Sequence, residues 1–79
     1  NSSDLDNCQY YARKAYRHFS DVESYASNCG CDGAESEAYD GYRDAKRAYN
    51  SSDLDNCQYY ARKAYRHGSY AEDEASSCN

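Results

Sequence analysis

The chain of 79 residues contains no proline, methionine or tryptophan, and its large aliphatic and phenyl side chains come from only two leucines, one valine and one phenylalanine. Proline is the residue that most strongly interrupts a helix interior, so its absence leaves helices free to run long. A core has to be built instead from alanine and from the eleven tyrosines. No run of about 18 apolar residues is present, so we expect no membrane insertion.

Acidic residues outnumber basic ones by 14 to 9, which gives a net charge of −5. A negative chain is repelled by a phosphate backbone, so we expect no nucleic acid partner. The sequence also lacks a glycine-rich phosphate loop and any grouping of nucleophile, base and acid side chains. We therefore expect no enzyme activity and no cofactor.

One stretch of the sequence occurs twice. The 18 residues Asn1–His18 return unchanged as Asn50–His67, which sets a period of 49 residues. Such repetition is typical of helical repeat proteins. We therefore predict that residues 1–49 form a first helical-hairpin unit and that residues 50–79 form a partial second unit. The two should pack as one domain of about one and a half units.

The two copies differ after the repeat ends. Gly68 stands where the first copy has Phe19, and Ala71 stands where it has Val22. Loss of large apolar groups is expected of a terminal capping helix that has no partner to pack against. We predict that role for the last segment. Because the chain begins at Asn1 and not at methionine, we also expect a processed or excised segment.

Small residues recur at alternating spacings of three and four, which is the heptad pattern of helices that pack along a seam. The first copy has Leu5, Cys8, Ala12, Ala15, Phe19, Val22, Ala26 and Cys29. The second copy has Leu54, Cys57, Ala61, Ala64, Gly68, Ala71, Ala75 and Cys78, and the segment between them has Ala34, Ala38, Gly41, Ala45 and Ala48. The pattern predicts an all-α fold, a three-helix antiparallel arrangement with a long, a shorter and a long helix.

Capping signals mark where these helices should start. Ser52 and Asp55 have the spacing of a capping box, so we expect the third helix to begin near Ser52. Ser20 and Glu23 have the same spacing. A break of the first helix near His18–Phe19 therefore stays open as an alternative, although the unbroken heptad spacing argues for one continuous helix.

Tyrosines flank the predicted seam. Tyr11 and Tyr25 lie on one side of it and Tyr16 lies on the other, so we expect the rings to fold over the alanines while their hydroxyl groups stay in water. Other tyrosines should point outward, and exposed tyrosine is enriched in protein interfaces. We expect a self-assembly surface from these outward residues: Tyr10, Tyr39, Tyr59 and Tyr70.

Five cysteines in a short chain predict disulfide bonds and an oxidising compartment, so we expect a secreted, extracellular protein. In the predicted bundle Cys8 and Cys57 lie at one end, and Cys29, Cys31 and Cys78 lie at the other. This predicts a Cys8–Cys57 bond and a second bond from Cys78 to either Cys31 or Cys29. The remaining thiol is a candidate for a link to another chain.

The cysteines and asparagines also have other interpretations. The three clustered thiols could hold a metal ion, but a fourth ligand is missing, so we expect no metal site. The seam cysteines could also stay reduced as small core residues. Asn1 and Asn50 each begin a glycosylation sequon, although helix capping is the simpler reason for asparagine there.

The repeat, the odd cysteine and the outward tyrosines together predict an extracellular structural subunit. We expect it to associate with itself, head to tail, in a filament or array. A monomeric, disulfide-stapled solenoid-type module that binds another protein is the first alternative. A designed or excised repeat segment with no activity of its own is the second.

Overall fold

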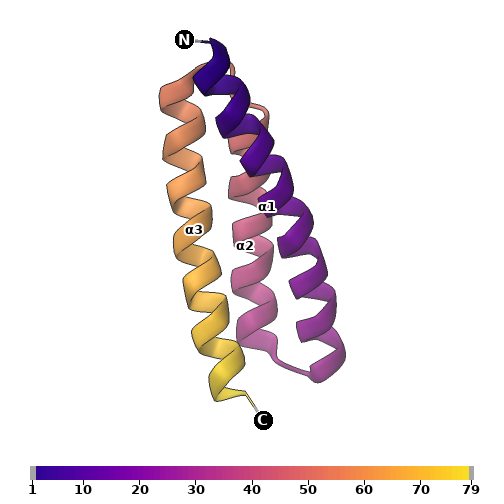
Figure 1. The fold of residues 1–79 in the computed structure, drawn as a ribbon. Helices are drawn as coiled ribbons and strands as arrows, with labels where there is room; N and C mark the ends of the chain where they lie inside the picture. The colour runs from indigo at the N-terminus through magenta and orange to yellow at the C-terminus, as the bar shows by residue number, and fades with distance from the viewer. Residues whose placement is uncertain (1, 79) are drawn as a thin grey trace.

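The computed structural model describes residues 2–78, with side chains from Asp4 onward. It consists of three helices: α1 spans Ser2–Cys29, α2 spans Asp32–Tyr49 and α3 spans Leu54–Ser77 (Figure 1). The predicted all-α fold is therefore confirmed. Within the described part of the chain, none of the helices combines the length and the apolar character that a membrane crossing requires.

α1 continues without a break through His18–Phe19, so the alternative of two shorter helices is wrong. The helix ends where Gly30 adopts a φ angle of 73°. There the amide of Cys31 donates to the carbonyl oxygen of Ala26 at 2.9 Å, and the amide of Gly30 donates to that of Ser27 at 3.2 Å. This is the Schellman pattern, which needs a left-handed residue that glycine supplies without steric cost.

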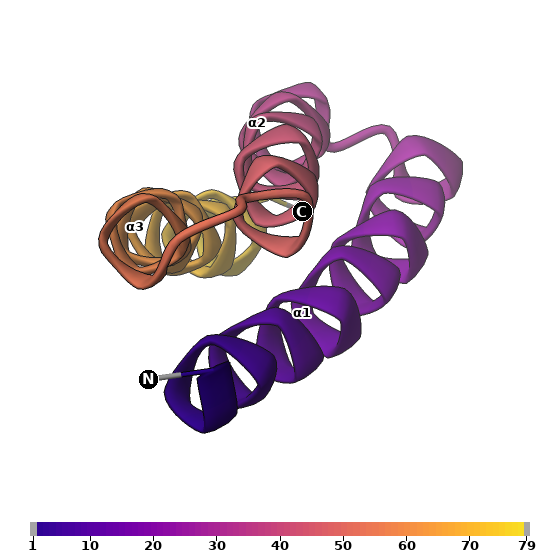
Figure 2. The ribbon, with the colours of Figure 1, turned by 90° about the horizontal axis from the view of Figure 1, so that it is seen from above.

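The three helices form an elongated body, 45 Å long and 16 by 13 Å across. α2 begins at the end of the molecule where α1 finishes, and α3 begins beside the start of α1 (Figure 1). α1 crosses the other two helices at an angle, so that α1 and α3 are close near their starts and move apart further along (Figures 1 and 2). α2 is thus the helix that packs against both of the others.

Alanine forms most of the core. Ala38, Ala45 and Ala48 of α2 have no exposed surface at all. A methyl side chain lets helices approach closely but contributes little apolar area, so this core is thin for its length. All seven central positions of the predicted seam are buried or half-buried: Ala12, Ala15, Ala38, Gly41, Ala45, Ala61 and Ala64.

The seam does not reach the far ends of the long helices. Cys29 and Ala75, which the heptad spacing placed in it, are exposed, so this part of the prediction is wrong. α1 and α3 have moved apart at that end of the molecule (Figure 1).

Phe19 is the largest buried side chain of residues 4–78, and two glycines make room for it. A Cβ atom on Gly41 of α2 would lie 2.6 Å from Phe19 Cε1, and one on Gly68 of α3 would lie 3.2 Å from Phe19 Cζ. Gly68 is the repeat counterpart of Phe19. The Phe19 ring of the first copy therefore packs into the space left where the second copy has glycine instead of phenylalanine. Gly68 therefore has a packing role within the bundle, because α3 packs against α2 and Gly68 accommodates Phe19. The capping role of the last segment stays a prediction.

α3 begins later than the capping-box spacing predicted. Its N-cap is Asp53 and not Ser52, which is a correction to the expected start. The Asp53 Oδ1 atom accepts a hydrogen bond from the backbone amide of Asn56 at 2.9 Å, and Oδ2 accepts one from the Asn56 side chain at 3.0 Å. A carboxylate at this position satisfies a free amide and also interacts favourably with the positive end of the helix dipole.

Candidate functional site

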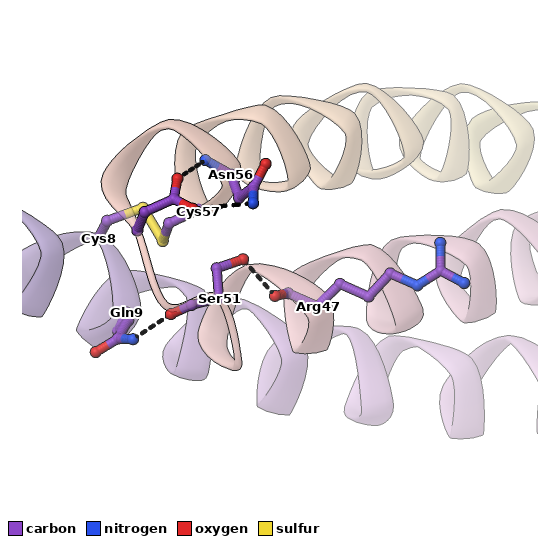
Figure 3. The surroundings of a disulfide bond; sticks show 7 residues. Cys8, Gln9, Arg47, Ser51, Asn56 and Cys57 are labelled. Atoms are coloured by element: carbon purple, nitrogen blue, oxygen red, sulfur yellow. Dashed lines mark hydrogen bonds between the residues drawn. A yellow bond between two sulfur atoms is a disulfide. The ribbon is translucent and has the colours of Figure 1, made fainter.

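The first disulfide bond joins Cys8 of α1 to Cys57 of α3 (Figure 3). It is the pairing expected from the helix order, and the fully buried Cys57 makes it part of the core. Next to it, the side-chain amide of Gln9 donates a hydrogen bond to the carbonyl oxygen of Ser51 at 2.7 Å. The Ser51 hydroxyl donates to the carbonyl oxygen of Arg47 at 2.8 Å. α1 is therefore tied both to the start of α3 and to the turn between α2 and α3.

The second disulfide bond joins Cys31 to Cys78, which is one of the two partners left open for Cys78. Cys29 remains as an exposed free thiol. All three residues line one hollow of about 300 Å³ at this end of the bundle. Because two of the three sulfur atoms are bonded to each other, the three cysteines cannot act together as metal ligands.

A groove of about 440 Å³ runs between α1 and α3. It exists because both helices pack against α2 but diverge from each other (Figure 2). Ala45 of α2 lies at its floor, and the polar members of its lining are His18, Ser69 and Glu72. The rest of the lining is apolar or aromatic: Cys8, Tyr11, Ala12, Ala15, Phe19, Ala61, Ala64, Tyr65 and Gly68.

α2 contacts opposite sides of the two identical sequences. On α1 it covers Tyr16, whose ring meets those of Tyr42 and Tyr49 edge-on at centroid distances of 5.8 and 5.7 Å. On α3 it covers Tyr60, and the Arg47 guanidinium lies 5.7 Å from the centroid of that ring. Each long helix therefore has one tyrosine side packed against α2 and one that α2 does not reach.

The uncovered tyrosines both lie at the groove. Tyr11 is the counterpart of Tyr60, and Tyr65 is the counterpart of Tyr16; their exposed fractions are 65% and 79%. Tyr25 is exposed as well. The expectation that Tyr11 and Tyr25 fold over the seam is therefore wrong, because α1 and α3 diverge and leave both rings exposed.

The four tyrosines expected to form a self-assembly surface are all exposed: Tyr10, Tyr39, Tyr59 and Tyr70. They are spread over all three helices. Lys14 Nζ lies 5.4 Å from the Tyr10 ring centroid. Its counterpart Lys63 lies 5.5 Å from that of Tyr59. These two rings are thus partly covered by a cation of their own helix, whereas the groove tyrosine Tyr65 has no such neighbour among the described residues.

The outer face of α2 lies on the side of that helix away from the groove. The Arg43 guanidinium lies 5.9 Å from the Tyr39 ring centroid on this face. Lys46 follows one turn later and donates a hydrogen bond to the Tyr42 hydroxyl at 3.2 Å. That hydrogen bond raises the pKa of Lys46 above its ordinary value of 10.5, so the side chain stays charged at neutral pH. The outer face is therefore aromatic and basic, whereas Glu72 brings a carboxylate to the groove.

Of the two asparagines that begin a glycosylation sequon, Asn50 lies within the described residues and Asn1 does not. Asn50 is exposed and forms the C-cap of α2, where its amide donates to the carbonyl oxygen of Lys46 at 3.0 Å.

In comparisons with protein-family models, curated proteins and solved structures, nothing matches this chain.

Proposed function

We propose that this protein is an extracellular structural subunit, about one and a half units of a helical repeat, that associates with itself head to tail. The observation that carries the proposal is the presence of a groove and a ridge on opposite faces of one molecule. Tyr11 and Tyr65 border the groove, and the ridge is the outer face of α2 with Tyr39 and Arg43. A contact between two different surfaces leaves one of each free, so association can continue.

The groove walls are suited to a second α2-type helix. Tyr16 and Tyr60 each pack a ring against α2 within the molecule. Their counterparts Tyr65 and Tyr11 offer the same kind of ring to an incoming helix. Tyrosine provides a large contact area at a low cost in side-chain entropy, which is why it is favoured in binding surfaces. We take the incoming helix to be α2 of a second copy.

Charge supports the same pairing of surfaces. Arg43 and Lys46 make the ridge basic, and Glu72 makes the groove locally acidic. Opposite charges across an interface fix its register and raise the association rate more than they raise the affinity. Exposed charge pairs are screened by salt, so we expect association to weaken as ionic strength rises.

The two disulfide bonds favour an oxidising, extracellular environment.

The free thiol of Cys29 has a limited role in such an assembly. One thiol per chain can link only two chains, with the loss of two protons and two electrons to an oxidant such as oxygen. Cys29 can therefore cross-link a pair, but the growth of an array depends on the groove and the ridge.

The test uses two variants that each damage one surface, both in a Cys29→Ser background. Tyr11→Ser with Tyr65→Ser removes the groove walls, and Tyr39→Ser with Arg43→Glu alters the ridge. Sedimentation velocity over rising concentration should show association of the parent protein and a monomer for each variant alone. When the two variants are mixed, one-to-one dimers should return, because each variant keeps one intact surface.

Tyr59→Ser is the matched control. The sequence predicts Tyr59 in an assembly surface, but this exposed residue lies neither at the groove nor on the outer face of α2. This variant should associate as the parent does. A parent protein that stays monomeric at the highest soluble concentration contradicts the proposal. So does a mixture of the two variants that stays monomeric, since a head-to-tail contact requires them to complement each other.

A module that binds a helix of a different protein is the second candidate. One observation favours it: apolar and small residues line the groove at helical spacing along α1. An amphipathic helix can lay its apolar face into such a groove. This candidate predicts a monomer that binds an amphipathic helical peptide, with binding weakened by Tyr65→Ser. The sedimentation experiment separates the two candidates.

A further inference from the structure

His18 and His67 occupy the same position in two identical sequences. Among the described residues, it is His67 whose ring contacts carboxylates. Glu37, Asp40 and Asp44 follow one another along the side of α2 that faces α3. Nδ1 of His67 lies 2.8 Å from Oε1 of Glu37, and Nε2 lies 3.3 Å from Oδ2 of Asp44. The ligand atoms of Glu37, Asp40 and His67 all lie within 4.8 Å of one another.

Asp44 provides a second, independent observation. At 6% exposure, its carboxylate is the buried polar side chain of the described residues. Burying a carboxylate is costly unless it is paired and hydrogen-bonded or lies beside a metal ion. The partner of Asp44 is Nε2 of His67. In the described part of the chain, no lysine or arginine forms an ion pair with Glu37, Asp40 or Asp44. Three carboxylates therefore face a single imidazole, and the cluster is short of positive charge.

We propose that this cluster binds a divalent first-row transition-metal ion of the Zn²⁺ class. Nδ1 of His67 and the carboxylates of Glu37 and Asp40 are the ligands. Asp44 accepts the Nε2 proton of His67, which fixes the ring so that Nδ1 carries the free lone pair. Histidines that bind metals usually donate their other ring N–H to a carboxylate or a carbonyl in this way.

The donor set selects the class of ion. One imidazole nitrogen with carboxylate oxygens suits Zn²⁺ and its neighbours, whereas Ca²⁺ and Mg²⁺ prefer oxygen ligands alone. Ligand atoms bound to one Zn²⁺ at about 2.1 Å lie roughly 3–4 Å apart. The Glu37–His67 distance is already close to this range, and the half-exposed Glu37 and Asp40 can close the remainder by rotating their side chains. Water completes the coordination.

No pattern in the sequence predicts this site. Its histidine is 30 residues from Glu37, and the three acidic residues of α2 have the spacing of any solvated helix side. The proposal departs from the sequence-based expectation of no metal site, which weighed the cysteine thiols and not these carboxylates. The packing of α3 against α2 is what brings His67 to the carboxylates and leaves His18 exposed at the groove.

The experiment titrates ZnCl₂ into untagged, oxidised protein carrying Cys29→Ser, which removes the free thiol as a competing ligand. Imidazole NMR signals report each histidine separately, and calorimetry gives the stoichiometry and affinity. We expect one ion per chain, with saturable shifts of the His67 signals. His18 has the same 18-residue sequence around it and should not respond, which makes it an internal control.

Three variants assign the roles. His67→Ala should weaken Zn²⁺ binding at least about 100-fold, and Asp44→Asn should weaken it about 10- to 100-fold, the range found for residues that orient a ligand. His18→Ala should leave the affinity unchanged. Circular dichroism checks that each variant keeps its helices. If His67→Ala does not fold, Asp40→Asn removes a ligand from the exposed edge of the cluster instead.

Several results would overturn the site. One is the absence of saturable binding; another is an equal response of both histidines. A third is a loss of affinity in His18→Ala that matches the loss in His67→Ala. Spectra that are identical with and without Zn²⁺ would mean that the cluster consists only of contacts between His67 and its carboxylates.

Discussion

Replacing either glycine that faces Phe19 with alanine should have opposite effects on stability. A Cβ atom at Gly41 would lie 2.6, 2.7 and 2.9 Å from three carbon atoms of the Phe19 ring. A Cβ atom at Gly68 would meet the same ring at 3.2 and 3.4 Å. The first set of distances requires the ring or a helix to move, whereas the second needs a shift of only a few tenths of an ångström.

The magnitudes follow from two opposing contributions. Alanine in place of glycine in a helix interior raises the free energy of unfolding by up to about 1 kcal/mol. Forcing an extra carbon into a packed core costs about 1–3 kcal/mol. We therefore expect Gly41→Ala to lower the free energy of unfolding by roughly 1 kcal/mol and Gly68→Ala to raise it by roughly 0.5 kcal/mol.

Urea unfolding followed by circular dichroism, with both disulfide bonds intact, measures the two changes. The cause is isolated by repeating Gly41→Ala in a Phe19→Val background, in which the ring atoms that crowd the new methyl group are absent. There Gly41→Ala should become stabilising, with a coupling energy of roughly 1–2 kcal/mol between the two positions.

The result that refutes this reasoning is equal stabilisation by Gly41→Ala and Gly68→Ala in the presence of Phe19. It would mean that the ring does not lie between the two glycines. A coupling energy near zero between Phe19 and Gly41 would have the same meaning.

Two further predictions concern the Cys8–Cys57 disulfide bond and the counterpart tyrosines Tyr16 and Tyr65. Replacing Cys8 and Cys57 with serine opens a closed loop of 49 residues and should lower the free energy of unfolding by about 2–4 kcal/mol, as measured by urea unfolding against the parent; an unchanged midpoint would show that this bond does not stabilise the fold. Tyr16→Ala should cost about 1–3 kcal/mol because its ring packs against α2, whereas Tyr65→Ala should change stability by less than about 0.5 kcal/mol. An equal loss of stability on Tyr16→Ala and Tyr65→Ala would contradict the conclusion that α2 covers Tyr16 and leaves Tyr65 exposed.

The helices and the placement of the cysteines could be predicted from the sequence. Spacings of three and four residues fixed which side of each helix is buried, and the absence of proline removed the main reason for a break. Once the order of the helices was known, Cys8 and Cys57 had to lie at the same end. The choice of Cys31 over Cys29 could not be predicted, because the two cysteines are only two positions apart and both lie at the end of the bundle where Cys78 lies.

The groove could not be predicted, because heptad spacing treats the two sides of a seam as equivalent. Tyr11 and Tyr60 are the same residue in the same local sequence, yet Tyr60 packs against α2 and Tyr11 does not. The difference is set by where α2 lies relative to each long helix. No pattern within one helix contains that information.

Two other features depend on contacts between the copies. Gly68 resembles a lost core residue until Phe19 is seen to occupy the space beside it. His67 resembles a surface histidine, as His18 is, until α2 brings Asp44 beside its ring. In both cases identical or aligned positions take different roles because the fold places them in different surroundings.

α2 leaves one tyrosine side of each long helix uncovered, and we propose that these two sides are free for association. A concentration series of two-dimensional NMR spectra tests it directly, because each tyrosine can be compared with its counterpart in the other copy. We expect concentration-dependent shifts at Tyr11 and Tyr65, with Tyr60 and Tyr16 unchanged. Shifts of equal size within each pair, or no shifts at any concentration, would contradict it.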